Sequence, residues 1–131
     1  MDGRGLPVSA FVTSARDAEV NTIETLVDIC VTGKRPQRLL YDKAADADWL
    51  RTSLAARGIE LISPHRRGRT RKKLQDGRPL RRYRHRWIVG RTIAWLGNFR
   101  RLVTRHEFYP ELFEGFLHLG CLLIVLRTFC N

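Results

Sequence analysis

The chain has 131 residues, which is enough for about one domain with a single modest core. Its 24 Lys and Arg against 13 Asp and Glu leave a net charge of +11, which favours a polyanionic partner. The cysteines show no Cys-x-x-Cys spacing and no matching His pair, which argues against a zinc site and a disulfide framework and favours a reducing cytoplasm.

The first third of the chain predicts a hairpin followed by a helix. Residues 3–7 have turn chemistry, and residues 8–13 alternate and are rich in β-branched and aromatic side chains, as in a strand. Apolar residues recur on one helical face between residues 17 and 31, and Gly33 closes that segment.

The middle of the chain predicts a strand, a helix and a second strand. Residues 38–42 form a short apolar run that suits a buried strand. Residues 44–57 predict a helix with an apolar face that includes Trp49 and Ala55, and Gly58 is a natural stop. Residues 59–62 return as a strand, so the order indicates an α/β layer with a largely parallel sheet.

Basic residues are concentrated in one segment. Between His65 and Arg86 there are eleven basic residues and one acid, Asp76, so this segment carries +10 and the rest of the chain about +1. A loop is expected over residues 65–82. A solvated charged loop is the alternative to a nucleic-acid interface, and the interface is favoured because so many like charges repel one another without counter-charge.

Two helices are expected in the last third, over residues 81–96 and 111–129. The apolar run at residues 116–126 has eleven residues, whereas a bilayer-spanning helix needs about 20. This predicts a buried core helix and no membrane partner.

Residues 83–102 resemble the catalytic-helix signature of insertion-sequence DDE transposases, with Gly90 at the position of the metal-binding Glu. Residues 2–8 resemble the family's hairpin, residues 40–51 its strand with the second catalytic Asp, and residues 98–102 with the apolar tail its C-terminal helix. The resemblance implies an α/β, truncated RNase H-like fold: a mixed sheet with flanking helices and a C-terminal helical tail. Residues 1–131 would then be one partial catalytic domain, with a basic loop at 65–82 and a C-terminal helical part at 83–129.

The resemblance also implies the chemistry of the site. Asp42 matches the second of three acids that hold Mg²⁺ or Mn²⁺ for DNA cleavage and strand transfer, so it is the predicted catalytic and metal residue. The first acid would lie on a strand before the hairpin, Gly90 replaces the third, and no Asp or Glu occurs between Asp76 and Glu107. Asp46 and Asp48 are expected to cap the following helix. A catalytically impaired protein of DNA transposition is therefore predicted.

Predicted DNA contacts come from a basic strip, the six cations of residues 66–73, and from the following helix. Trp87 and Trp95 are expected in the core. The partner is expected to be DNA at transposon ends, in the cytoplasm of a bacterium and associated with the nucleoid, with a homo-oligomer or a full-length transposase left open. The alternatives are a non-catalytic regulator of transposition and a basic RNA-binding protein. The predicted DNA-binding residues are Arg66, Arg67, Arg69, Arg71, Lys72, Lys73, Tyr83, Arg84, Arg86 and Arg91.

Overall fold

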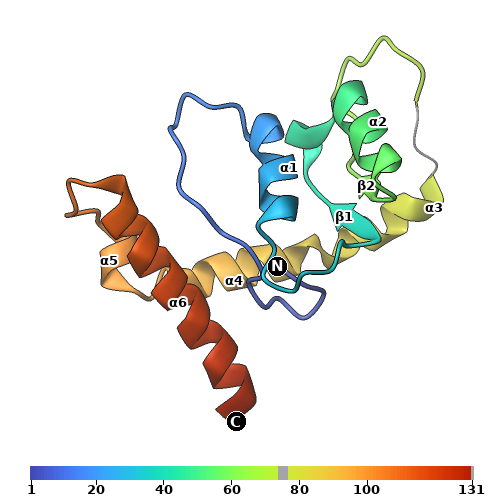
Figure 1. Cartoon of the computed structure of the whole chain (residues 1–131). Helices are drawn as coiled ribbons and strands as arrows, with labels where there is room; N and C mark the ends of the chain where they lie inside the picture. The colour runs from blue at the N-terminus through green and yellow to red at the C-terminus, as the bar shows by residue number, and fades with distance from the viewer. Residues whose placement is uncertain (74–76, 131) are drawn as a thin grey trace. The chain divides into compact units, whose positions relative to one another are not determined.

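The computed structural model describes residues 1–73 and 77–130, which pack as two compact units (Figure 1). The central unit comprises residues 16–86. The terminal unit combines residues 1–15 with the chain from residue 87 onward. The assignment of residues 1–131 to a single domain stays a prediction.

The central unit contains the predicted strand–helix–strand order. Its helix α1 (Glu19–Asp28) precedes strand β1 (Arg38–Leu40), helix α2 (Asp48–Ala56) and strand β2 (Glu60–Ile62). The two strands pair in parallel, with Leu39 opposite Leu61, because a helical crossover returns the chain in the same direction. The predicted α/β class is confirmed for this unit, with a sheet of two strands among the described residues.

Leu50 and Leu54 of α2 are fully buried and form the core of the central unit with Ile23 of α1 and Ile59 and Leu61 around β2. They share a face because residues four apart on a helix are neighbours. Trp49 and Ala55 are exposed, so the buried face of this helix is narrower than predicted. Gly58 follows the helix with φ of +75°, which confirms it as the stop.

The helix predicted over residues 44–57 is broken near its start. A 3-10 helix, η1 (Lys43–Ala45), comes first, and α2 begins only at Asp48. Asp42 caps η1 by accepting the Ala44 N–H at 2.8 Å. The intervening Asp46 lies between the two elements, and its carboxylate bonds to Arg66 and Arg69 of the basic segment.

The basic segment begins as a loop through residue 73 and continues as two short helices, α3 (Gly77–Leu80) and the 3-10 helix η2 (Arg81–Arg86). The loop predicted over residues 65–82 therefore extends too far, because residues 77–82 are helical. Its acid, Asp76, lies outside the described residues. The helix predicted over 81–96 is divided between η2 in the central unit and α4 (Trp87–Leu96) in the terminal unit.

The terminal unit consists of α4, α5 (Arg100–Val103), α6 (Pro110–Cys130) and the N-terminal segment. Its opening turn is held by Asp2, whose carboxylate accepts the backbone N–H groups of Arg4 and Leu6 at 2.9 Å. The strand predicted over residues 8–13 is wrong, since the described residues there form no strand. Their backbone groups bond to α6 instead: the Ala10 carbonyl accepts from His118 at 2.9 Å.

Helix α6 confirms the predicted last helix, but the prediction that it is a buried core helix is wrong. Within it only Gly120 and Ile124 are buried. With 21 residues and high mean hydropathy, it is long and apolar enough to cross a membrane by length and composition, and 17% of its most apolar window is buried. The prediction counted only the apolar residues 116–126 and so underestimated the length of helix that could cross a membrane. The large exposed side chains on it are Leu112, Leu119, Leu122, Leu123, Leu126 and Phe129.

Gly5→Ala should destabilise the terminal unit by about 2–4 kcal/mol, because it combines backbone strain with overpacking. Gly5 has φ of +90°, and a Cβ there would lie 2.9 Å from side-chain atoms of both Ile88 and Thr92. Thr92 also donates its hydroxyl to the Gly5 carbonyl at 2.7 Å. Urea unfolding measures the loss, and Gly3→Ala is the matched control because a Cβ at residue 3 meets nothing within 4 Å. Equal stability of the two variants would contradict this account.

Candidate nucleic-acid interface

Asp42 lies two residues beyond the carboxyl end of β1, at the end of the strand segment predicted over residues 38–42. The strand ladder continues one residue beyond β1, where the Tyr41 N–H donates to the Ile62 carbonyl at 3.0 Å. The Asp42 side chain is 35% exposed; one oxygen caps η1, and the other pairs with Arg86 at 3.2 Å. Its carboxylate is thus bonded within the central unit.

Arg86 reaches Asp42 from η2, where its guanidinium also lies 6.0 Å from the centre of the Tyr83 ring. The sequence predicted that Arg86 binds a phosphate, and the structure brings it to an acid of its own chain. The surroundings of Tyr41 reflect this charge balance: burial raises the pKa of its hydroxyl, helped by the negative charges of Glu19 and Asp42, while Arg86 acts to lower it.

The donor set does not fit the two-metal centre that the resemblance implies. Mg²⁺ and Mn²⁺ prefer several oxygen ligands, and within residues 1–73 and 77–130 no group of three or more His, Cys, Asp or Glu could hold a metal ion. Gly90 is an exposed residue of α4 without a side chain to offer, and a Cβ built on it meets nothing within 4 Å. A single carboxylate already paired with an arginine cannot hold two divalent ions.

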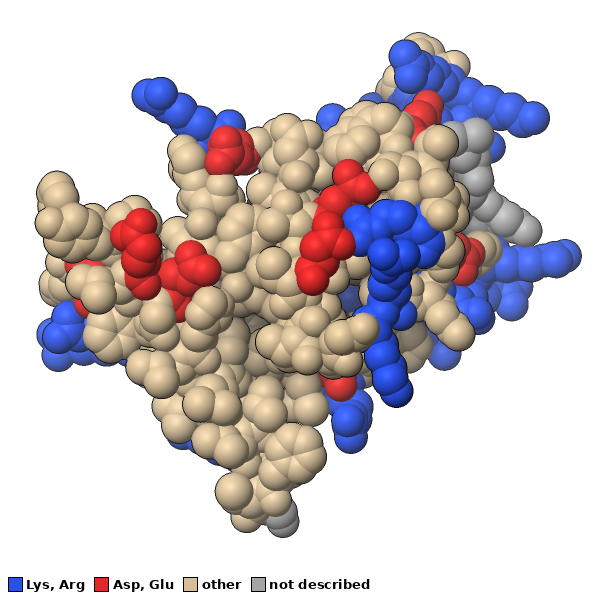
Figure 2. All heavy atoms as spheres, viewed as in Figure 1, with Lys and Arg blue, Asp and Glu red and all other residues tan. Residues whose placement is uncertain are grey.

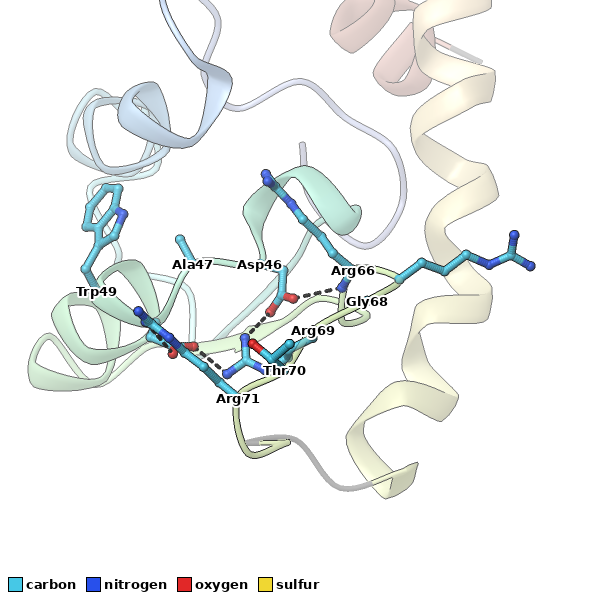
Figure 3. Close-up of a pocket in the computed structure, with 10 residues that line it drawn as sticks. Asp46, Ala47, Trp49, Arg66, Gly68, Arg69, Thr70 and Arg71 are labelled. Carbon is cyan, nitrogen blue, oxygen red and sulfur yellow. Dashed lines mark hydrogen bonds and ion pairs between the residues drawn. The ribbon is translucent and has the colours of Figure 1, made fainter.

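Asp46, a buried acid that was predicted to cap a helix, holds the basic loop in place through its side-chain bonds. The side chain of Asp46 is only 2% exposed. Its carboxylate accepts the Arg66 N–H at 2.8 Å and pairs with Arg69 at 3.2 Å (Figure 3). It also forms a hydrogen bond with His65 Nδ1 at 2.8 Å and pairs with Arg51 at 3.2 Å. The capping role predicted for Asp46 is wrong, because the residue that precedes α2 is Ala47.

These bonds control the acidity of Asp46. Burial by itself would raise the pKa of its carboxyl, but the hydrogen bonds from Arg66, His65 and Arg51 outweigh burial and lower the pKa to about 2. Asp46 is therefore an anion at neutral pH despite its burial, and the surrounding donors stabilise that charge.

Asp48 anchors the same loop from the first turn of α2, where its charge complements the helix dipole. The predicted capping role is wrong for Asp48 too, because the N-cap is Ala47 and no side chain of the described residues caps the helix. Arg69 pairs with Asp48 at 2.7 Å, and Arg71 approaches the same carboxylate at 3.5 Å. The hydrogen bond from Arg69 lowers the pKa of Asp48, against the effect of desolvation. The side chain of Arg69 is only 11% exposed, whereas that of Arg71 is 80% exposed.

The basic strip therefore divides into anchored and exposed cations. Arg66 donates its guanidinium to the carbonyls of Lys43 (3.0 Å) and Ala44 (2.9 Å), directly after Asp42. The guanidinium of Arg69 forms ion pairs with Asp46 and Asp48. Lys and Arg side chains project over the loop after β2 and over α3 (Figure 2). Arg66 is still exposed despite these bonds, and the other exposed members of the strip are Arg67, Arg71, Lys72 and Lys73, of which Arg71 approaches Asp48 at 3.5 Å.

Arg91, in the terminal unit, lies between two indole rings on α4. Its guanidinium is 5.1 Å from the Trp87 ring centre and 4.9 Å from that of Trp95, and it donates to the Arg4 carbonyl at 2.8 Å. Trp87 is 61% and Trp95 39% exposed, so the prediction that they belong to the core is wrong. Residues at i, i+4 and i+8 line one helical face, and here that face stacks an arginine instead of entering a core.

The chain belongs to the family of the transposase DDE domain, whose model matches residues 1–126. It is similar to the putative transposase for insertion sequence element IS402 of Burkholderia cepacia, with 35% identity over 97% of this chain. The match covers 60% of that relative, so the chain spans about three fifths of the length of the curated relative it matches. No solved structure matches the chain.

Acid should weaken the central unit through Asp46. Because its folded-state pKa of about 2 lies below the ordinary value of 3.8, its contribution to stability is complete above about pH 4 and is lost as the pH falls through about 2. The free energy of unfolding should fall by about 2 kcal/mol over that window, and Asp46→Asn should remove this part of the pH dependence. Urea unfolding at several pH values measures it, with the exposed Glu60→Gln as control. An unchanged pH profile in Asp46→Asn would exclude this role.

Proposed function

We propose that the protein acts in the transposition of an insertion sequence by binding DNA through its basic loop, and that the chain does not cleave DNA by itself. The observation that carries the DNA-binding part is the folding of the loop against η1. Arg66 bonds to the two carbonyls that follow Asp42, so a cation-rich surface adjoins the acid that matches the family's second catalytic Asp. Clustered Lys and Arg supply most of the affinity for a phosphate backbone.

The absence of catalysis follows from the acids that the chain presents. Asp42 matches one ligand of the implied triad and is paired with Arg86, while Gly90 occupies the place of another. We include in the proposal a truncated RNase H-like arrangement, supported by the parallel β1–β2 pair with its α2 crossover. Binding of Mg²⁺ or Mn²⁺ is not expected at Asp42 alone.

A second candidate is a non-catalytic regulator that pairs with full-length transposase or with another copy of the chain. The exposed leucines of α6 favour it, because a large apolar surface is typical of a protein contact. We propose that α6 contacts protein and not membrane, since Glu114 and His118 on this helix bond to the backbone of residues 10–12. The proposed location is the bacterial cytoplasm, at the nucleoid.

Gel-shift titrations at several salt concentrations test the proposal and separate the alternatives. The full chain is titrated against terminal inverted-repeat DNA, shuffled duplex DNA and duplex RNA of equal length. Salt-dependent binding to both DNAs supports DNA binding, and a preference for the repeat favours a regulator at transposon ends. Equal or tighter binding to RNA, or no binding to DNA at low salt, would overturn the proposal.

A further inference from the structure

The hollow beside Asp46 is built by two segments of the central unit, residues 46–49 and residues 66–71, and has a volume of about 420 Å³ (Figure 3). The loop that forms one side of it begins immediately after the buried Ser63. It has no helix or strand over residues 63–73 to support it. Its shape therefore depends on the side-chain bonds that Asp46 and Asp48 make to it.

We propose that this hollow is a docking site for the phosphodiester backbone of DNA, and that Asp46 is the positioning residue that gives the site its shape. The inference rests on the proposed DNA-binding function and deepens it. It assigns the contact to one surface, and it gives an acid a favourable role in binding a polyanion.

The charges around the hollow suit a phosphate. Four arginines and two aspartates line it. The aspartates receive their donors from within the unit: Arg51 and Arg69 offset their charge, and His65 adds a hydrogen bond. Arg67 and Arg71 are exposed at its edge, and Thr70 adds an exposed hydroxyl, which is a common phosphate donor.

Asp46 is suited to positioning because its bonds reach several parts of the loop. It holds the backbone of Arg66, the ring of His65 and the guanidinium of Arg69. Without that anion, the loop's cations would repel one another and the backbone would gain conformational freedom. Binding would then have to order the loop, whereas a preorganised surface avoids that cost.

The test is a substitution for which positioning and simple electrostatics predict opposite changes in the affinity for DNA. Asp46→Asn removes a negative charge, so simple electrostatics predicts tighter binding to DNA. Positioning predicts weaker binding, by about tenfold at about 100 mM salt, and a salt slope shallower by about 1–2, because one or two phosphate contacts are lost. The measurement is the affinity of the full chain for a shuffled DNA duplex over a salt series.

Glu60→Gln is the matched control. It removes the same charge from the same unit, but Glu60 is exposed and forms an ion pair with the exposed Arg38 at 3.2 Å, away from the hollow. The Glu60→Gln variant should bind the DNA duplex as tightly as the wild type or slightly more tightly, with an unchanged salt slope. Arg67→Gln tests the site directly and should make the slope shallower by about 1.

Folding is monitored by circular dichroism and by hydrogen exchange of the Arg66 amide, which bonds to Asp46 at 2.8 Å. That amide should exchange faster in Asp46→Asn while the amides of β2 stay protected. If Asp46→Asn fails to fold, Arg69→Gln replaces it, since this change leaves Asp46 bonded to Arg51 and His65. Removing a cation weakens binding by itself, so the exposed Lys34→Gln is then the control, and a loss of affinity no larger than that of Lys34→Gln would overturn the inference. Tighter binding or an unchanged slope in a folded variant would overturn the inference while the proposed function stands. Failure of the wild type to bind DNA would overturn both.

Discussion

Changing the four exposed cations of the basic strip to glutamine should lower the affinity for duplex DNA about 1,000-fold at about 100 mM salt. The four residues, Arg67, Arg71, Lys72 and Lys73, are exposed, whereas Arg69 is committed to Asp46 and Asp48. Each phosphate contact releases nearly one counterion, so the slope of log affinity against log salt should become shallower by nearly 4. Fluorescence anisotropy with a labelled duplex over a salt series measures both quantities.

The control for this variant removes the same charge elsewhere. Lys34, Arg35, Arg100 and Arg127 are all exposed and lie outside the basic segment. Changing them to glutamine lowers the net charge by the same four units and weakens long-range attraction equally, but it should leave most of the salt slope in place. An equal loss of affinity and slope in both variants would show that binding depends on net charge and not on the basic strip.

The second prediction concerns the cleavage of DNA. Supercoiled plasmid incubated with the wild-type chain and Mg²⁺ or Mn²⁺ should stay intact, and Asp42→Ala should give the same result. An active metal-dependent enzyme would lose many orders of magnitude in rate on losing such an acid. Here no loss is expected, because the remaining carboxylate pairs with Arg86 and no cluster of metal ligands accompanies it in the described part of the chain. The measurement is the conversion of supercoiled DNA to nicked DNA over time.

Gly90→Glu extends this experiment, with Gly90→Ala as its matched control. Both changes should stabilise α4 by about 0.5–1 kcal/mol, because glycine is unfavourable inside a helix and the position has room for a Cβ. Gly90→Glu should still leave the plasmid intact, since it restores the third acid beside Asp42 and so brings the chain to only two of the three acids that the family uses. Metal-dependent nicking by the wild type that is lost in Asp42→Ala would contradict the proposed lack of catalysis.

The central unit shows how one segment can serve both folding and binding. Arg66 and Arg69 hold the loop to η1 and α2, while their neighbours in sequence are exposed. A run of cations without such anchors would repel itself, and a run in which every cation was anchored would have none to offer to DNA. Two groups of acceptors hold the anchored cations: Asp46 and Asp48 pair with Arg69, and the carbonyls of Lys43 and Ala44 accept from Arg66.

Local patterns in the sequence were sufficient to predict the central elements and the family. The apolar run ending at Asp42 predicted β1, and Gly58 predicted the end of α2, because a buried strand and a left-handed helix stop depend on residues close in the chain. The signature around residues 83–102 indicated the transposase DDE family, which the family comparison shows.

The tertiary structure decided which side chains those elements bring together. Asp46 and Arg69 are 23 positions apart, and nothing in the local pattern distinguishes their ion pair from a helix cap or a solvated charge. The residues of 8–13 have strand propensity, yet a strand needs a hydrogen-bonded neighbour, and the backbone there bonds to α6 instead. Propensity and periodicity report on neighbours along the chain, whereas ion pairs and strand pairing depend on neighbours in space.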